Sequence, residues 1–296
     1  MSLHEITEEE RRTLQSALLR MLLDLQYVCE KHDITFMLGG GSALGAVRHH
    51  GFIPWDDDLD INMPRADYER FKAAFSEEMG HEYDMSAPNT DHVVYSFMKI
   101  YKKGTVCREA FDALQYDGLW IDIFPIDYTP NSLLRRKIKG YFSDFLHFIG
   151  ASLLISQHEN DSTKEMYQQN SARRLRYFVA LFLGKILPFD ASYVINYFDR
   201  FVQGTPSEYM TVPTGRNHYH GETLPTSAFI PTKKISFEGV QVPVSKRVEQ
   251  YLTHLYGDYM QIPPVEKREK HYITKFEVQK NVTWIVKDKM QNGGMT

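Results

Sequence analysis

Residues 38–61 read LGGGSALGAVRHHGFIPWDDDLDI, and this stretch decides how the chain folds. An apolar run from Ile34 to Leu38 ends abruptly in the glycine turn, residues 39–42. β-forming residues that stop at glycines predict a strand that enters a tight turn. The next residues, Ala43 to His50, are enough for about two helical turns, with Ser42 as the expected N-cap.

The glycine turn is a candidate anion site. A strand that leads into Gly40, Gly41 and Ser42 and then into a helix gathers backbone N–H groups at the positive helix end. An anionic phosphate binds to such groups, and glycine lets it approach closely. By itself a turn of this kind is more often structural, so its meaning depends on the residues that follow.

An acidic run follows the turn and leads into a second apolar strand. Residues two apart in a strand face the same side, so Asp58 and Asp60 present two carboxylates to one spot while Leu59 and Ile61 face the core. At about 7 Å the two charges repel by roughly 2 kcal/mol at an effective dielectric near 20, a cost that bound Mg²⁺ would reverse. An exposed acidic turn is the alternative. The nearby glycine turn favours a metal-nucleotide site.

Three rival motifs fail on spacing. An EF-hand loop from Asp56 would need glycine where Ile61 stands and glutamate where Asp67 stands. A Walker A loop needs Gly-Lys-Ser/Thr, which the sequence lacks. A dinucleotide fold needs GxGxxG and one acid, whereas this chain offers GGGSALG and an alternating pair.

The rest of the chain alternates helical and strand-like patterns, which predicts an α/β (α+β) fold. Thr7 and Glu10 form a capping box at the start of a long amphipathic helix. The other expected elements are strands at Asp58–Met63, Val93–Tyr101 and Leu119–Phe124, a helix at Arg65–Met79, a hairpin at Ile235–Val244 turning at Glu238-Gly239, and a helix at Lys246–Tyr256 ended by Gly257.

Three regions are expected from these patterns. Residues 1–130 form the core, and residues 131–205 form a helical insertion or subdomain with basic and aromatic clusters. Residues 206–296 complete the core, and the tail frays after Lys287.

Composition limits the function classes. The 296 residues are 43% hydrophobic and 24% charged, as in ordinary globular proteins. A net charge of −4 gives no overall attraction to nucleic acid, so no nucleic-acid partner is expected. Cys29 and Cys107 have no metal-ligand or CxxC spacing, which favours a reducing compartment, the cytoplasm. No stretch reaches the roughly 18 apolar residues of a membrane span.

The stretch 38–61 resembles the signature of the LicD family, the phosphocholine transferases related to fukutin-related protein. The likeness extends weakly through Lys99, Thr105, residues 120–125 and residues 255–264, and it shows no motif in the central helical region. The resemblance implies a nucleotidyltransferase fold, with a mixed sheet flanked by helices.

The same resemblance implies roles for individual residues. Gly40, Gly41 and Ser42 would hold the nucleotide phosphates, and Asp58 and Asp60 would be metal ligands for Mg²⁺, with Mn²⁺ as an alternative. A third strand carboxylate is expected, for which Asp122 is the first candidate, Asp127 is the second, and a buried structural aspartate is the alternative. Asp56 is either the base for the acceptor hydroxyl or an outer ligand.

The implied reaction moves phosphocholine from CDP-choline, or a similar CDP-linked donor, to a hydroxyl of a cell-surface glycan precursor, releasing CMP. The acceptor would be of teichoic acid or lipopolysaccharide type, and the enzyme would work in the cytoplasm, including the inner face of the membrane. Two alternatives stay open: nucleotidyl transfer to a small hydroxylated acceptor, and a nucleotide-binding module without catalysis.

Other side chains are weaker candidates. Arg48 and Lys99 are candidate phosphate contacts, with a solvated charge as the alternative reading. Trp55, Trp120 or nearby tyrosines could face a choline headgroup. The histidines of His218-Tyr219-His220 suggest metal binding, but they and His271 are more typical of ordinary polar residues. The basic and aromatic helices of residues 131–201 could contact an anionic membrane that holds a lipid-linked acceptor, with ordinary helix packing as the alternative.

Overall fold

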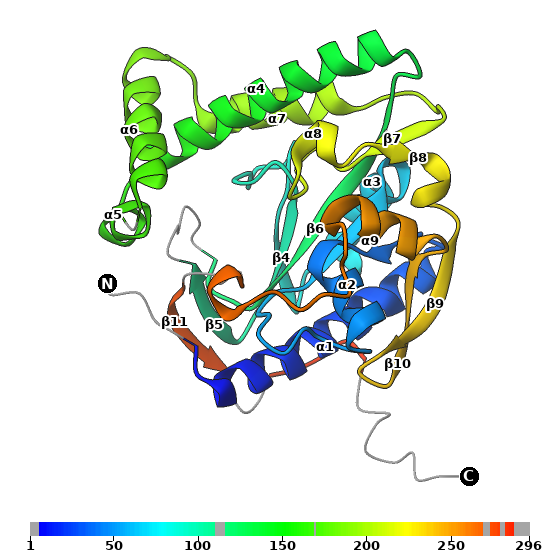
Figure 1. The fold of residues 1–296 in the computed structure, drawn as a ribbon. Coiled ribbons are helices and arrows are strands. Elements are labelled where there is room, and N and C mark those ends of the chain that lie inside the picture. The colour runs from blue at the N-terminus through cyan, green and yellow to red at the C-terminus, as the bar shows by residue number, and fades with distance from the viewer. Residues whose placement is uncertain (1–5, 110–115, 169, 269–272, 279–281, 287–296) are drawn as a thin grey trace, which may run out of the picture.

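The computed structural model describes residues 6–109, 116–168, 170–268, 273–278 and 282–286 (Figure 1). It is a mixed α/β fold in which helices surround a curled sheet, as the sequence predicted. His271 and the tail expected to fray after Lys287 lie outside the described residues.

The central sheet is mixed. In the described part of the chain it has seven strands: β1 (Met37–Leu38), β2 (Asp60–Pro64), β6 (Trp120–Thr129), β4 (Met98–Lys102) and β3 (Tyr83–Ser86) in spatial order, with β7 (Tyr209–Thr211) paired to β6 and β8 (Leu224–Pro225) paired to β7. Strands β2 and β6 run parallel, and the other pairs are antiparallel. Asp60 on β2 is therefore in register with Asp122 on β6.

Alternation along β2 separates the core from the site. Leu59, Ile61 and Met63 are buried in the main hydrophobic core, as the sequence predicted for the first two. Asp60 and Asn62 point to the opposite face. Each fully buried aliphatic side chain contributes about 2 kcal/mol, so the core fixes which face the polar residues take.

Four helices pack around the sheet: α1 (Glu8–Lys31), α2 (Gly40–Arg48), α3 (Arg65–Glu78) and α9 (Val248–Tyr256). The predicted capping box at the start of α1 is confirmed, because Thr7 Oγ1 accepts from Glu10 N at 3.2 Å and Thr7 N donates to Glu10 at 2.8 Å. The predicted end of α9 is also confirmed, since its C-cap Gly257 has φ +67°.

Residues 133–202 are largely helical, as predicted. They form α4 (Leu133–Gln157), α5 (Asp161–Gln168), α6 (Ser171–Ile186) and α7 (Ala191–Val202). Figure 1 shows α4 and α7 on one side of the sheet and α1 on the opposite side, with α6 at the far end of α4. In the described residues no single helix has the length and apolarity of a membrane span; α6 and α7 meet that test only as a pair, bent by 102°.

An ion-pair triad joins these helices to the sheet. Arg65 at the start of α3 donates to both carboxylate oxygens of Asp127 on β6, at 2.8 and 2.7 Å. It also donates to Asp199 on α7 at 2.8 Å. Both aspartates are buried, so the shared guanidinium offsets part of the cost of keeping their charges inside the protein.

The C-terminal part contains the predicted hairpin, now β9 (Thr232–Phe237) and β10 (Val240–Ser245), which turns at Glu238-Gly239 as expected. His218-Tyr219-His220, expected in a loop, begins the short helix α8 (His218–Gly221). The remaining elements were not predicted: the pair β5 (Thr105–Glu109) and β11 (Ile273–Val278), and two 3-10 turns, η1 (Thr226–Ala228) and η2 (Val265–Lys267).

Several expected boundaries were wrong; the strand expected over Leu119–Phe124, for example, runs on to Thr129. The strand expected over Val93–Tyr101 begins only at Met98, because Val94 packs in a separate cluster with Leu153 of α4 and Ile195 of α7. The strand expected from Ile34 is reduced to β1.

Candidate functional site

The glycine turn lies directly against the acidic run. Gly40 opens α2 with φ +42°, a left-handed conformation that favours glycine. A Cβ atom at Gly40 would lie 2.9 Å from Asp60 Oδ2, and one at Gly41 would lie 3.2 Å from Asp56 Oδ2. The missing side chains therefore make room for the two carboxylates.

Ser42 was predicted as the N-cap of this helix, and that prediction was wrong. The helix begins three residues earlier than expected, at Gly40, with Gly39 as its N-cap. The Ser42 hydroxyl instead accepts a hydrogen bond from Asp60 N at 2.9 Å, and Gly39 N donates to Asp60 O at 2.9 Å. Ser42 is thus positioned to hold the strand that carries Asp60.

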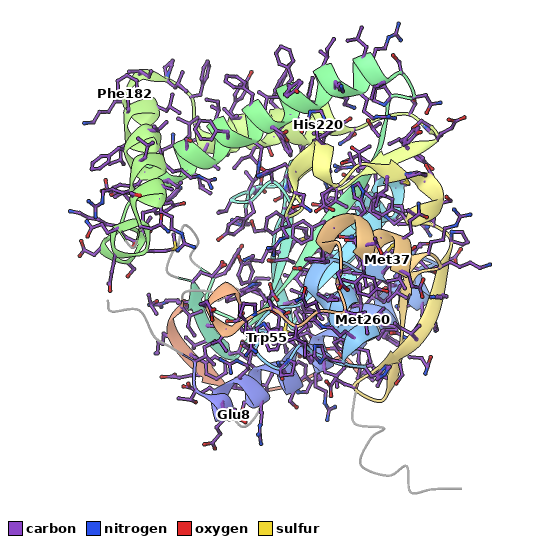
Figure 2. All side chains as sticks on the ribbon, in the orientation of Figure 1. Glu8, Met37, Trp55, Phe182, His220 and Met260 are labelled. Atoms are coloured by element: carbon purple, nitrogen blue, oxygen red, sulfur yellow. The ribbon has the colours of Figure 1, made fainter. Side chains whose placement is uncertain are left out.

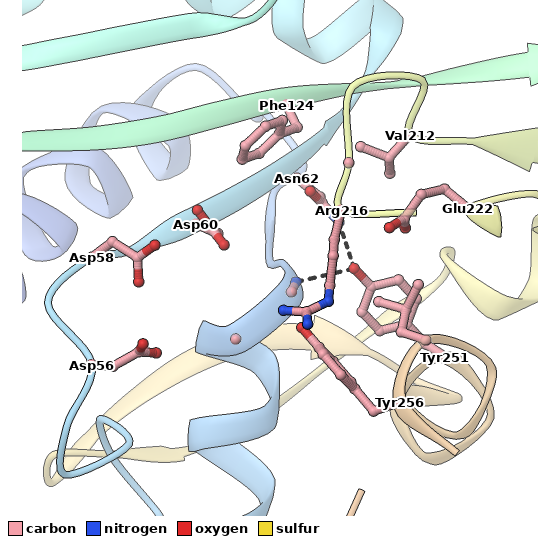
Figure 3. A pocket seen from close by; sticks show the side chains of 14 residues that line it. Asp56, Asp58, Asp60, Asn62, Phe124, Val212, Arg216, Glu222, Tyr251 and Tyr256 are labelled. Carbon is pink, nitrogen blue, oxygen red and sulfur yellow. Dashed lines mark hydrogen bonds between the residues drawn. The ribbon is translucent and has the colours of Figure 1, made fainter. Parts of the chain in front are cut away.

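A cavity opens beside the turn (Figure 3). Its lining comes from both ends of the sequence: Gly40, Gly41, Asp56, Asp58, Asp60, Asn62, Phe124, Val212, Gly215, Arg216, Glu222, Tyr251, Leu255 and Tyr256. Figure 3 shows Asp56, Asp58 and Asp60 along one side of the space and Arg216, Tyr251 and Tyr256 along the other. The acidic run therefore faces the Arg216 guanidinium across the cavity.

The predicted aspartate pair reaches this cavity. Strand β2 begins at Asp60, so Asp58 precedes the strand instead of opening it, yet both residues line the cavity. One carboxylate oxygen from each of Asp56, Asp57 and Asp58 lies within 4.8 Å of the other two. All of these donors are hard oxygen ligands, the type that Mg²⁺ prefers, so the residues present fit such an ion.

Asp122 is placed next to this group by the sheet. It is the register partner of Asp60 in the parallel pair of β2 and β6. Backbones of neighbouring strands lie about 4.8 Å apart. Phe124, two residues further along β6, lines the cavity, so Asp122 lies on the same face of the sheet, although outside the cavity lining itself. The second candidate, Asp127, is fully buried in the ion pair with Arg65, which leaves Asp122 as the candidate third carboxylate.

Lys99 is neither a solvated charge nor part of the cavity lining. Its ammonium lies 2.9 Å from Glu109 Oε2 and 3.4 Å from Asp122 Oδ1, and its side chain is 2% exposed. Burial opposes the charge, but Asp122 and Glu109 outweigh burial and raise the pKa of Lys99. This placement favours a role in positioning Asp122 over the phosphate contact that the sequence indicated.

The ring of Trp120, a candidate aromatic contact for choline, already lies against the ammonium group of Lys99. Lys99 Nζ lies 4.6 Å from the ring centroid. The aromatic residues that do line the cavity are Phe124, Tyr251 and Tyr256, so two tyrosines lie beside the site, and their contact with a choline headgroup stays a prediction.

Arg48 and Trp55 lie in an adjacent groove with Tyr256 and Arg268. The Arg48 guanidinium donates to the carbonyl oxygens of Tyr259 at 2.8 Å and Gln261 at 3.3 Å. Arg268 lies over the Trp55 ring at 3.9 Å from its centroid. In this arrangement Arg48 holds the segment after α9 against α2.

Several lining residues were not predicted. Tyr251 on α9 has a hydroxyl that accepts from Gly40 N at 3.1 Å and from Asn62 Nδ2 at 3.2 Å, so α9 supports the glycine turn. Arg216, whose guanidinium carbon lies 5.6 Å from the Tyr256 ring centroid, brings a positive charge to the cavity. The family resemblance reached only the end of α9, weakly, through residues 255–264, and no motif in the sequence marked Arg216.

Glu222 is another lining residue that was not predicted. It lines the cavity with only 2% of its surface exposed, and it accepts a hydrogen bond from Asn217 N at 3.1 Å. Burial raises the pKa of Glu222 to about 7. A carboxyl group of this kind can take up or release a proton near neutral pH.

Comparison with known proteins gives the family. Residues 33–147 match the family described as LicD/FKTN/FKRP, nucleotidyltransferase domain. The lipopolysaccharide cholinephosphotransferase LicD of Haemophilus influenzae is 30% identical over 273 residues, which cover 88% of this chain and 96% of that protein. The chain belongs to the LicD family.

Shorter matches join two uncharacterised proteins to this LicD-family chain. One, from Rickettsia typhi, is 39% identical over 56 residues (19% of this chain and 18% of that protein). The other, from Rickettsia prowazekii, is 41% identical over 51 residues (17% and 19%). The LicD-family domain match includes the glycine turn, the aspartate run and Asp122, whereas Arg216, Glu222 and Tyr251 lie beyond it. The cavity therefore combines the matched domain with residues from the C-terminal part.

Proposed function

We propose that this chain transfers phosphocholine from CDP-choline to a hydroxyl group of a cell-surface glycan precursor. One observation carries the proposal: in a LicD-family chain, the glycine turn, Asp56, Asp58 and Asp60 line one cavity together with Arg216. The name of the Haemophilus relative favours a lipopolysaccharide acceptor over one of teichoic acid type.

The proposed metal is Mg²⁺, with Mn²⁺ as the alternative. Asp56, Asp58 and Asp60 would hold it, and Asp122 would complete the set from the neighbouring strand. When bound, the ion would neutralise the diphosphate and align it for displacement. Asp56 Oδ2 lies against Gly41 and close to Asp57 and Asp58, which supports a ligand role for Asp56 over the role of base.

The other residues have separate tasks in this proposal. The backbone amide at Gly41 would face the phosphates, since the Gly40 amide already donates to the Tyr251 hydroxyl, and Arg216 would balance charge on the departing CMP. The acceptor oxygen forms a bond to the phosphorus of phosphocholine, while the bond from that phosphorus to the bridging oxygen breaks and its electron pair leaves with CMP. The hydroxyl proton passes to a carboxylate, and we assign this role to Glu222 because its pKa of about 7 suits a base at neutral pH.

A donor screen tests the proposal directly. The purified chain is heated with Mg²⁺ and CDP-choline, CDP-ethanolamine, CDP-ribitol or CDP-glycerol, and with an excess of chelator as control. Binding at about 100 times Kd should add roughly 2.7 kcal/mol to the stability of the folded state, and we expect this for CDP-choline only in the presence of the metal. Equal stabilisation by all four donors would reject selectivity for choline.

Product analysis separates the alternatives. Incubation with CDP-choline and a lipopolysaccharide precursor should release CMP and leave phosphocholine on the acceptor. A nucleotide found on the acceptor would identify nucleotidyl transfer instead. Donor binding without any product would identify a nucleotide-binding module.

A further inference from the structure

Exposed apolar side chains gather on the helical segment instead of spreading over the surface. Of the 18 large hydrophobic side chains that are exposed among the described residues, 14 lie between Leu133 and Tyr197. We call the exposed side chains of α4, α6 and α7 the docking face. A soluble monomer seldom leaves so much apolar surface together unless another surface covers it.

Helix α4 carries a continuous part of this face. Leu134, Ile138, Tyr141, Phe145 and Phe148 recur every three or four residues and are 37–68% exposed. This spacing places them on one side of the helix over four turns. The opposite side is already buried, so the stripe is not needed for packing within the chain.

The other two helices extend the face. On α6, Leu175, Phe178, Phe182 and Ile186 are 55–66% exposed, and Figure 2 shows Phe182 at the outer edge of the molecule. Aromatic contacts continue from α4 to α7, because Phe201 lies 6.5 Å between ring centroids from Phe142 and also from Tyr197.

The charge of the segment has the opposite sign to that of the whole protein. Residues 133–202 contain ten Lys and Arg against six Asp and Glu, a net charge of +4, whereas the whole chain carries −4. The exposed cations are interleaved with the apolar side chains: Arg135, Lys137, Arg173, Arg174, Arg176 and Lys185. Asp199, one of the six acids, is already neutralised by Arg65.

Aromatic and aliphatic side chains bordered by cations match the interface of an anionic lipid bilayer, where rings enter the headgroup region and cations meet lipid phosphates. A second copy of the same face would bring net positive charge against net positive charge. We propose that the docking face lies on the surface of an anionic lipid membrane.

The docking face is mechanically connected to the cavity. Helix α4 packs against α8 so closely that a Cβ atom at Gly140 would lie 2.4 Å from the His220 ring. Asp144 also accepts a hydrogen bond from Tyr219 N at 3.2 Å. Helix α8 lies in the sequence between Arg216 and Glu222, both of which line the cavity. On the basis of the proposed function, membrane binding would therefore hold the cavity at a fixed orientation to a bilayer that carries a lipid-linked acceptor.

Vesicle sedimentation tests the proposal without donor or acceptor, so its result does not depend on the proposed activity. The full chain is mixed with vesicles of phosphatidylcholine alone, or of equal parts phosphatidylcholine and phosphatidylglycerol, at low and high salt. We expect binding to the anionic vesicles only, weakened by salt. Each cation near an anionic surface contributes about fivefold to partitioning, so Arg135→Gln with Lys137→Gln should lower it roughly 25-fold.

Matched variants separate the docking face from general surface effects. Phe142→Ser with Phe145→Ser should also abolish most of the binding. The controls Tyr27→Ser, at a ring that is 50% exposed on α1, and Lys246→Gln, at an exposed cation before α9, should leave it unchanged. Circular dichroism and thermal unfolding verify that each variant is folded.

Three results would overturn the proposal. The first two are equal binding of the parent chain to both kinds of vesicle and no binding to either. The other is loss of a concentration-dependent dimer in the docking-face variants, which would assign the face to a second copy of the chain.

Discussion

Replacement of Gly40 by alanine tests whether the aspartates must lie against the glycine turn. The new Cβ atom would stand 2.9 Å from Asp60 Oδ2, closer than real Cβ contacts allow, so the carboxylate has to move. The left-handed backbone at φ +42° adds a separate cost of about 1 kcal/mol. An ordinary contact near 3.4 Å requires a shift of only about half an ångström, and because a misplacement of about 1 Å can lower a rate roughly 100-fold, we expect a loss of about 10-fold.

Gly239→Ala supplies the matched control. Gly239 has φ +80° in the β9–β10 hairpin, but a Cβ atom there would meet nothing within 4 Å. Both variants should lose about 1 kcal/mol of stability in urea unfolding, whereas only Gly40→Ala should lose CMP release from CDP-choline. If Gly40→Ala kept turnover equal to that of Gly239→Ala, contact between the turn and Asp60 would have no catalytic role.

Four further substitutions each test the role of one side chain. Asp60→Asn, like Asp58→Asn, should lower turnover by orders of magnitude and leave the urea midpoint nearly unchanged, so near-normal turnover in either variant would reject the assignment of both residues as metal ligands. Lys99→Met removes the buried cation between Asp122 and Glu109 and should lower the free energy of unfolding by about 3–5 kcal/mol at pH 7. Part of this stability should return at acid pH, where the two carboxyls take up protons. A loss below about 1 kcal/mol would contradict this account. Glu222 has its folded pKa raised from 4.5 to about 7, so its protonated form is favoured in the folded chain, and stability should fall by roughly 3 kcal/mol as pH rises from below 4.5 to above 7. Glu222→Gln should remove both that slope and the rise of turnover through pH 7, and an unchanged pH profile would exclude Glu222 as the base.

The sequence predicted those parts of the fold that depend on local signals. The Thr7–Glu10 capping box, the turn at Glu238-Gly239 and the helix end at Gly257 each require a few adjacent residues, and the structure contains all three. The contact between the glycine turn and the aspartate run was also within reach, because one short crossover connects them.

The rest of the cavity depends on long-range contacts. Arg216, Glu222 and Tyr251 come from residues more than 150 positions after the aspartate run, and their local sequences carry no pattern that points to the site. The environment of Lys99 depends on the tertiary contact that brings Glu109 of β5 next to it, and the residue pattern of either strand does not predict that contact. Ser42 was misread because a hydroxyl at the start of a helix usually caps it, whereas here the neighbouring strand takes that hydroxyl.

The Arg65 triad affects any attempt to trim the protein to a minimal catalyst. Excision of α4 to α7 would retain Asp127 and Glu69 but remove Asp199, so Arg65 would lose one of its three acidic partners. The same cut would strip α8 of the helix on which it rests. A shortened version would therefore need new side chains around Arg65 and new packing for the segment that carries Arg216 and Glu222. The helical segment is part of the structure that supports the cavity, so it cannot simply be removed.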